Sequence, residues 1–230
     1  DMLTTINELG RDNLIAGGVP GERIHVTGSP AFDSLASPLR IEEAARERER
    51  MGWTGLKVIL WAGHLDLPMA ADGPEADPAY LGRTVERLLR ELVAACPDAA
   101  LLIRYHPNHI EHFADGVAQE RVFWSDPLIR SAQVDVQMAD IVVVHGSTIG
   151  LEAAIAGKSV LAMDNSPSRH ISPLSDFGVA VGVPSFDQLV PMVRAAMQAP
   201  HAHAFPNQKG AAADKVADLI AAAAEARYPS

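Results

Sequence analysis

The stretch that decides the fold is VVVHGSTIGLEAAIAGKSVLAMD, residues 142–164. An apolar run leads into a turn at His145 and Gly146, and an amphipathic stretch with one acid, Glu152, follows the turn. A glycine and a lysine then break the pattern, and a second apolar run begins. Near-continuous apolar runs are typical of parallel strands that are buried on both faces. The stretch therefore predicts a strand, a helix and a second strand.

The same alternation extends along most of the chain. Apolar runs predict strands at residues 56–64, 99–107, 121–124, 139–146, 158–164 and 178–183. Helices are expected at residues 2–17, 41–51, 79–96, 147–157, 185–199 and 211–226. Strands that alternate with helices indicate a parallel sheet covered on both faces. We therefore expect an α/β protein with a Rossmann-like, doubly wound parallel sheet.

The composition narrows the class of protein. Hydrophobic residues make up 48% of the 230 residues and charged residues 21%, which is typical of a globular protein. The net charge of −10 argues against a nucleic-acid partner, which requires a basic surface. No apolar run approaches the roughly 20 residues of a membrane span. A single cysteine, Cys96, excludes an intrachain disulfide, and we expect a reducing, cytoplasmic location.

Polar side chains follow three of the expected strands. His64 ends the first strand, and the second ends in RYHPNH, with Arg104 and His106. His145 opens the segment HGSTIGLE after the fourth strand. Ligands of open α/β sheets bind outside the carboxyl ends of the strands. Because a doubly wound sheet brings these ends to one edge, we expect the three groups to share a site.

The segment HGSTIGLE has two interpretations. Gly146 permits an unusual backbone dihedral, and Ser147 or Thr148 can cap the next helix, whose free N–H groups attract an anion. In the first interpretation this helix end holds a phosphate, and Glu152, one turn later, accepts the hydroxyls of a ribose. In the second, the segment is an ordinary capped helix, and Glu152 only interacts favourably with the helix dipole.

The other two strand ends also leave alternatives open. His106 precedes a proline that restricts it, and its ordinary pKa suits a hydrogen bond to phosphate or general acid catalysis. Alternatively, backbone carbonyls satisfy the His106 ring. His64 precedes a loop rich in proline, glycine and aspartate, which suits an acceptor-facing loop and a plain surface loop equally. His109 is placed at the start of the next helix and is assigned no role.

Several common sites are not indicated. No metal site is expected, because His106 and His109 are three residues apart across a strand-to-helix corner and need not face one ligand. The chain also lacks the lysine motif of P-loop ATPases and the G-x-G-x-x-G fingerprint of dinucleotide-binding proteins. These absences argue against an ATPase or a dehydrogenase that uses NAD.

The motifs resemble the C-terminal, donor-binding half of GT-B glycosyltransferases. This group includes the non-hydrolysing UDP-N-acetylglucosamine 2-epimerases and bacterial capsule or cell-envelope polysaccharide transferases. The matching stretches are GVPGERIHVTGSPAFD at 18–33, RYHPN at 104–108, residues 139–164 and SPSRH at 166–170. The resemblance extends from Asn13 to Met197. It implies that residues 51–200 bind a nucleotide-sugar, that residues 1–50 enter from a missing N-terminal domain, and that residues 201–230 form a linker and a terminal helix.

The strand ends suggest roles for individual residues, and the resemblance implies those of Ser147, Thr148, Glu152 and Arg169 and the phosphate contact of His106. His106 and His64 are the candidate catalytic residues, and His106 also contacts the donor phosphate. Phosphate and nucleotide binding fall to Arg104, His145, Gly146, Ser147, Thr148, Glu152 and Arg169. Among these, Glu152 takes the ribose hydroxyls and Arg169 helps to neutralise the diphosphate. The expected substrate is a UDP-, CMP- or CDP-sugar, and no metal or other cofactor is expected.

The expected function is a glycosyltransferase of bacterial surface polysaccharide synthesis. The epimerase motifs HR.EN and SGG.QEE are incomplete at residues 64–67 and 146–152, where the arginine, the glycine pair and one glutamate are missing. The alternatives are a 2-epimerase-like isomerase and a non-catalytic nucleotide-binding subunit. Expected partners are a sugar or polysaccharide acceptor and the missing N-terminal domain or a partner chain. Peripheral contact with the inner membrane is left open, although no basic amphipathic helix is evident.

Overall fold

The computed structural model describes residues 2–113, 119–199 and 211–227. The chain divides into a larger unit, residues 38–205, and a smaller unit that combines residues 1–37 with residues 206–230. Residues 38–50, expected to belong to the N-terminal linker, therefore fall in the larger unit. The linker expected at residues 201–210 lies outside the described residues.

The larger unit is built on a parallel six-stranded sheet in the order β5-β4-β3-β6-β7-β8. The chain enters at the centre of the sheet, fills one side, and then crosses β3 to fill the other. This is the doubly wound arrangement that the sequence predicts. The strands are β3 (Lys57–Gly63), β4 (Ala99–Tyr105), β5 (Val122–Trp124), β6 (Ile141–Val144), β7 (Ser159–Met163) and β8 (Val181–Val183).

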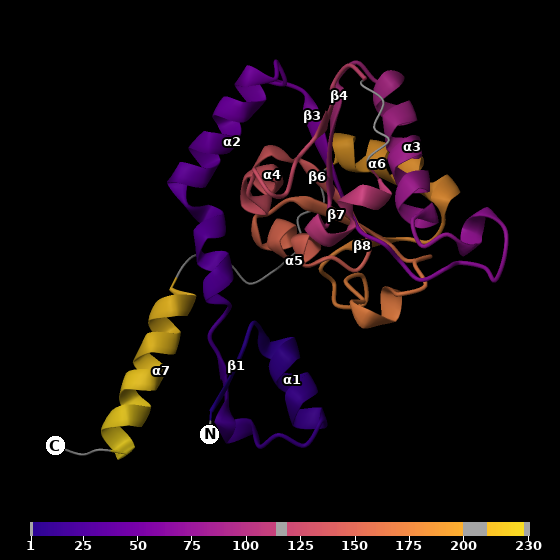
Figure 1. The fold of residues 1–230 in the computed structure, drawn as a ribbon. Helices are drawn as coiled ribbons and strands as arrows, with labels where there is room; N and C mark the ends of the chain where they lie inside the picture. Colours follow the sequence, from indigo (N-terminus) through magenta and orange to yellow (C-terminus); the bar gives the residue numbers. More distant parts are fainter. Residues whose placement is uncertain (1, 114–118, 200–210, 228–230) are drawn as a thin grey trace. The chain divides into compact units, whose positions relative to one another are not determined.

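Helices cover both faces of this sheet (Figure 1). One face carries α3 (Tyr80–Ala94) and α6 (Phe186–Gln198), and the other carries α2 (Pro38–Arg50), α4 (Ala132–Met138) and α5 (Thr148–Ile155). The loops that follow β3, β4 and β7 contain the short 3₁₀ helices η3 (Pro74–Ala76), η4 (Pro107–His112) and η5 (Arg169–Ile171). The layers therefore match a Rossmann-like half of a GT-B fold.

The core consists of two layers, because successive strand residues point to opposite faces. In β3, Ile59 and Trp61 pack with α3 and α6, whereas Val58 and Leu60 pack with α4 and α5. All four are fully buried. The sheet is thus apolar on both faces, which explains why its strands read as continuous apolar runs.

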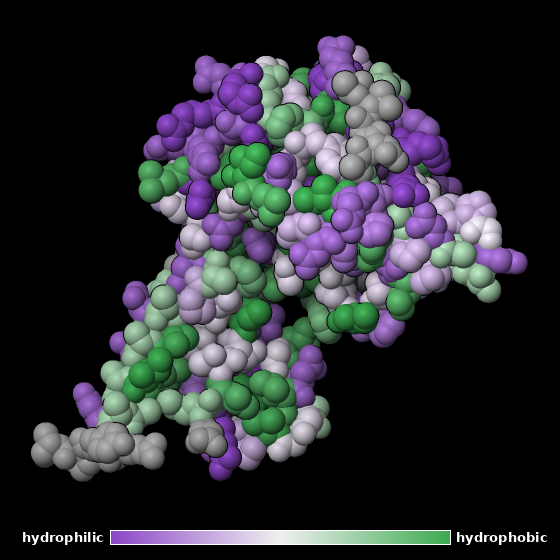
Figure 2. Space-filling view, viewed as in Figure 1, coloured by the Kyte–Doolittle hydropathy of each residue, from purple (hydrophilic) through white to green (hydrophobic). Residues whose placement is uncertain are grey.

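Helix α2 shows how a highly charged segment can still pack. Its surface is mostly hydrophilic where it faces the viewer at the upper left of Figure 2. Ala44 is its buried residue, and Arg48 donates hydrogen bonds to the carbonyl oxygens of Met138 and Leu56. These bonds attach the helix to the ends of α4 and the loop before β3.

The smaller unit contains a two-stranded parallel sheet, β1 (Leu3–Thr5) with β2 (Ile24–Val26). It also contains α1 (Glu8–Ala16), α7 (Ala212–Arg227) and two 3₁₀ turns, η1 (Gly21–Arg23) and η2 (Pro30–Ala36). The carboxylate of Asp33 accepts hydrogen bonds from the backbone N–H groups of Ala212 and Ala213, at 3.1 and 2.8 Å. Asp33 thus caps the N-terminus of a helix far away in sequence.

The single helix expected at residues 2–17 is wrong. Residues 3–5 form a strand, and the helix begins only at Glu8. Asn7 is the cap, and its side-chain oxygen accepts a hydrogen bond from Gly10 N at 2.8 Å.

Within the described residues, no helix combines the length and apolar character needed to span a membrane.

Candidate functional site

The centre of the site is the point where the strand order reverses. β3 and β6 are direct neighbours, with Ala62 opposite Val144. His64 follows β3 and His145 follows β6, so the two residues lie side by side. Their ring centroids are 4.0 Å apart. In doubly wound sheets this crevice at the carboxyl ends is where ligands bind. The sequence prediction that these strand ends share one edge is confirmed for this pair.

His145 is buried completely, with 0% of its surface exposed. Its ring stacks on Trp61, with the ring centroids 5.4 Å apart. Burial, reinforced by the neighbouring His64 ring, lowers the pKa of His145 to about 3, although Asp66 and a hydrogen bond with the backbone of His64 oppose this shift. His145 is therefore neutral at pH 7. Its predicted contact with phosphate is not tested by this arrangement, which places the ring beneath His64.

Two further histidines lie beside His64. His106 follows β4 and caps η4, and its Nδ1 accepts a hydrogen bond from Asn108 N at 3.2 Å. His109 lies one turn further along η4, with its ring centroid 5.1 Å from that of His106 and 6.4 Å from that of His64. Because a 3₁₀ helix has three residues per turn, positions i and i+3 lie on the same side. Sequence reasoning placed an ordinary helix start here and missed this juxtaposition.

The turn after β6 leads into the N-terminus of α5, as predicted. Gly146 has a φ of +64°, a left-handed conformation that favours glycine. Ser147 is the cap, and its Oγ accepts a hydrogen bond from Ile149 N at 3.3 Å. Thr148 is exposed at the first position of the helix. Of the N–H groups in this first turn, those of Ile149 and Gly150 already bond to Ser147, which leaves that of Thr148 for an anion.

Glu152 lies on α5, one turn beyond Thr148, and is partly buried. Burial raises the pKa of this carboxyl, and the positive charge of Arg104 opposes the shift. Among the described residues, this carboxyl group makes no hydrogen bond or ion pair. A partly buried carboxylate in this position can accept hydrogen bonds from hydroxyl groups of a ligand.

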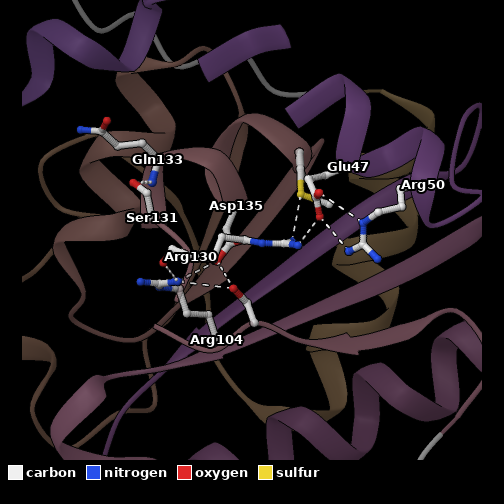
Figure 3. Close-up of polar contacts among 9 residues, drawn as sticks. Glu47, Arg50, Arg104, Arg130, Ser131, Gln133 and Asp135 are labelled. Atoms are coloured by element: carbon white, nitrogen blue, oxygen red, sulfur yellow. Dashed lines mark hydrogen bonds and ion pairs between the residues drawn. The ribbon is translucent and has the colours of Figure 1, made fainter. Parts of the chain in front are cut away.

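Arg104, in contrast, is already engaged within the protein (Figure 3). It is only 8% exposed, and its Nη1 donates to Asp135 Oδ2 and to the carbonyl oxygen of Arg130, both at 2.9 Å. Ser125 Oγ donates to the same carboxylate oxygen at 2.5 Å. Figure 3 shows Arg130 reaching from this group toward Glu47 of α2. The predicted contact of Arg104 with phosphate therefore stays a prediction.

Asp66 links two loops at the edge of the sheet. Although it is 7% exposed, its carboxylate accepts hydrogen bonds from Ser166 Oγ at 2.6 Å and Ser168 N at 3.2 Å. Burial acts to raise the pKa of Asp66, but the hydrogen bonds from the two serines, together with His145 and the backbone N–H of Leu67, lower it overall. The loop after β3, which carries His64, is thereby fixed to the loop after β7. Sequence reasoning missed this contact, because the partners are about 100 residues apart.

Arg169 lies just beyond that contact, at the start of η5. Its Nε lies 3.1 Å from Asp164 Oδ1, and its Nη2 pairs with Asp176. Two carboxylates therefore already balance its charge. The structure places Arg169 at the carboxyl end of β7, and its predicted role toward a diphosphate is not tested.

A cavity of about 270 Å³ opens beside η4, at the ends of β4 and β5. Two aromatic side chains and several apolar ones form its walls. The lining residues are Tyr105, Ile110, Trp124, Ser125, Asp126, Pro127 and Leu128. Within the described residues, no cluster of three or more histidine, cysteine or acidic side chains suits a metal ion. The edge thus combines an anion-attracting helix end, histidine rings, the carboxyl group of Glu152 and a largely apolar cavity.

A family model described as UDP-N-acetylglucosamine 2-epimerase matches residues 1–221 of the chain. No curated protein sequence matches it. Among solved structures, UDP-GlcNAc 2-epimerase from Neisseria meningitidis, bound to UDP-GlcNAc, is 18% identical with a TM-score of 0.68, over 96% of this chain and 61% of that one. The enzyme from Methanocaldococcus jannaschii, in complex with UDP-GlcNAc and UDP, is 13% identical with a TM-score of 0.62, over 95% and 61%.

The wall teichoic acid polymerase TagF is also similar, with 14% identity and a TM-score of 0.61 over 99% of this chain and 59% of that one. At these identities the likeness shows the fold. The chain spans about three fifths of the length of each of these proteins.

Proposed function

We propose that this chain, which belongs to the UDP-N-acetylglucosamine 2-epimerase family, forms the donor-binding half of a GT-B glycosyltransferase. The proposed reaction is metal-independent transfer of a sugar from a nucleotide donor to a sugar or polysaccharide acceptor. We place it in the synthesis of bacterial surface polysaccharide, on the cytoplasmic side of the membrane. The rest of the protein, or a partner chain, supplies the acceptor site.

One observation carries this proposal: the capped N-terminus of α5 opens onto the same edge as the histidine rings. We assign the donor phosphates to the N–H groups and hydroxyls of Ser147 and Thr148, approached across Gly146. A helix N-terminus attracts negative charge through its unpaired N–H groups and its dipole. It can therefore stabilise a leaving nucleotide without a metal ion.

Other residues of the edge complete the donor site. Glu152 accepts the ribose hydroxyls, and the cavity lined by Tyr105 and Trp124 receives the base against apolar walls. His106 donates to the phosphates, and His64 faces the reacting sugar. Arg104 and His145 act through other residues. The charge of Arg104 acts on the carboxyl group of Glu152, and His145 supports the ring of His64. Arg169 adds positive charge at the end of β7.

Binding can be tested by the thermal stability of the chain with UDP, CMP, CDP, GDP and ADP. A ligand at 100 times its dissociation constant adds about 2.7 kcal/mol of stability. We expect one nucleotide to stabilise the chain, and the stabilisation to be lost in Glu152→Ala. Glu91→Gln, which changes an exposed acid on α3, is the matched control and should keep the full shift. No shift with any of the nucleotides would contradict the proposal.

The second candidate function is 2-epimerisation, which the family match and the two epimerase structures favour. The two activities differ in their need for an acceptor. Conversion of UDP-N-acetylglucosamine to its 2-epimer without any acceptor, followed by NMR, would favour the epimerase. Release of nucleotide that depends on an added acceptor would favour the transferase.

A further inference from the structure

Three histidines of the site have one ring nitrogen held by the backbone, and these contacts specify where each neutral ring carries its proton. The Nδ1 of His109 lies 3.2 Å from the N–H of Leu65, and the Nδ1 of His106 lies 3.2 Å from the N–H of Asn108. A backbone N–H can only donate, so both Nδ1 atoms accept. The proton of each neutral ring is therefore on Nε2.

His64 has the opposite arrangement. Its Nδ1 forms a short hydrogen bond with the carbonyl oxygen of Leu65, which can only accept. The ring proton is therefore on Nδ1, and Nε2 keeps its lone pair. A Cβ atom added at Gly146 would lie 3.8 Å from this Nε2, so the lone pair is close to the turn before α5.

Leu65 thus orders two rings at once, through its oxygen to His64 and its N–H to His109. We propose that His109 is a further donor-binding residue, whose Nε2–H hydrogen-bonds to the diphosphate together with that of His106. The two ring centroids are 5.1 Å apart, which lets both N–H groups reach oxygens of one diphosphate. This assignment rests on the proposed function, and it leaves His64 Nε2 as the hydrogen-bond acceptor of the site.

The electrostatic surroundings favour a neutral donor at His109. Burial lowers the pKa of this ring, and the neighbouring His106, His64 and His112 lower it further, whereas Glu111 acts in the opposite direction. A neutral histidine with a fixed Nε2–H donates to phosphate at neutral pH without needing protonation.

Two substitutions separate this role from a structural one. His109→Asn retains a short polar group at the position of Nδ1, and can still accept from Leu65, but lacks a donor at the position of Nε2. His109→Gln has an N–H donor near the position of Nε2 and loses the contact with Leu65. Titration calorimetry measures how tightly each variant binds the nucleoside diphosphate that stabilises the wild-type chain. His112→Asn, on the exposed side of η4, is the matched control.

We expect His109→Asn to weaken binding about tenfold or more, which is typical of a lost hydrogen bond to a charged group. His109→Gln should stay within about threefold of the wild type, and His112→Asn should be unchanged. If the glutamine variant binds weakly and the asparagine variant binds normally, His109 acts only through its contact with Leu65, and the assignment is overturned. The assignment is also overturned if both variants weaken nucleotide binding equally, or if neither variant weakens it. A wild-type chain that binds no nucleoside diphosphate would reject the proposed function itself, and this assignment with it.

The tautomers can be tested without any nucleotide. Long-range ¹H–¹⁵N spectra of histidine-labelled protein distinguish a ring protonated on Nδ1 from one protonated on Nε2. We expect the Nε2–H form for His106 and His109 and the Nδ1–H form for His64. A proton on Nδ1 of His109 would overturn the assignment, even in a chain that binds nucleotides.

Discussion

Two pairs of ionisable side chains lie at the same edge of the sheet, and they differ in the kind of contact that holds them. The Arg104–Asp135 pair, between β4 and α4, is charged, and it is surrounded by further hydrogen bonds from Ser125 and to a carbonyl oxygen. The His64–His145 pair, at the ends of β3 and β6, consists of a half-buried and a fully buried ring, tilted against each other with their centroids 4.0 Å apart.

The difference separates groups that hold the fold from groups that remain available. A buried charge is tolerated only when it is paired and hydrogen-bonded, so the Arg104–Asp135 pair is committed to the structure. His145 is neutral, so its burial requires no counterion, and the half-buried ring of His64 beside it can reach a ligand. We therefore look for ligand chemistry on the histidine side of the edge and for stability on the ion-pair side.

The largest expected effect follows from breaking the ion pair. Asp135→Ala removes the carboxylate and leaves the guanidinium of Arg104 buried without its counterion. Removal of one partner of a buried pair typically costs about 3–5 kcal/mol of stability. Denaturant unfolding measures this loss, with Asp72→Ala, an exposed aspartate, as the control. A loss below about 1 kcal/mol would show that the pair is not the structural element that we describe.

The second effect concerns the histidine pair and appears only in acid. The folded-state pKa of His145 is lowered to about 3, so below pH 6.5 the unfolded chain binds a proton that the native chain does not. Stability is therefore lost as the pH falls from 6.5 toward 3, by about 3 kcal/mol between pH 7 and pH 4. His145→Phe should remove this part of the acid destabilisation.

Unfolding of both proteins across this pH range provides the measurement. The informative quantity is the difference between the two stability profiles, because groups that do not interact with His145 titrate equally in both. Parallel profiles for the wild type and His145→Phe would contradict a buried, neutral His145.

The third effect compares the helix caps on the two sides of the edge. Ser147 caps α5 on the histidine side, and Ser131 caps α4 on the ion-pair side, and each Oγ accepts a backbone hydrogen bond at 3.3 Å. Alanine at either position should cost about 1 kcal/mol of stability. Nucleotide binding, measured by titration calorimetry, should weaken in Ser147→Ala and stay normal in Ser131→Ala. Equal binding by the two variants would place the ligand elsewhere.

The sequence predicts the histidine side of this comparison better than the ion-pair side. His64, His106 and His145 each end a long apolar run, so the sheet topology alone brings them to one edge. The pairing of His106 with His109 required the 3₁₀ geometry of η4, and an ordinary α-helix would not have aligned them in the same way.

The ion-pair network was not predictable from local patterns. Asp135 is fully buried in a helix of only seven residues, too short for a clear apolar period, and its partner Arg104 is 31 residues away. The short strand β1 was missed for a related reason. Three residues with an exposed, weakly apolar pattern carry little information, and their pairing with β2 determines their conformation.

The smallest effect tests whether burial determines how much an ion pair contributes to stability. On α3, Arg87–Glu91 and Arg90–Glu86 have the same spacing of four residues and the same N–O distance of 2.7 Å. The side chains of the first pair are 59% and 60% exposed, whereas those of the second are 16% and 13% exposed.

Exposed pairs of this kind contribute about 0.3–0.5 kcal/mol, because solvent and salt screen their attraction. Glu91→Ala should therefore lower the stability by no more than about 0.5 kcal/mol. Glu86→Ala should cost more, because Glu86 also accepts a hydrogen bond from the buried hydroxyl of Tyr105 at 2.7 Å. Denaturant unfolding of both variants, with and without high salt, measures the two losses. If the two substitutions lower the free energy of unfolding equally, burial does not distinguish the two pairs. The argument that the buried Arg104–Asp135 pair contributes more than exposed ion pairs then loses its physical basis.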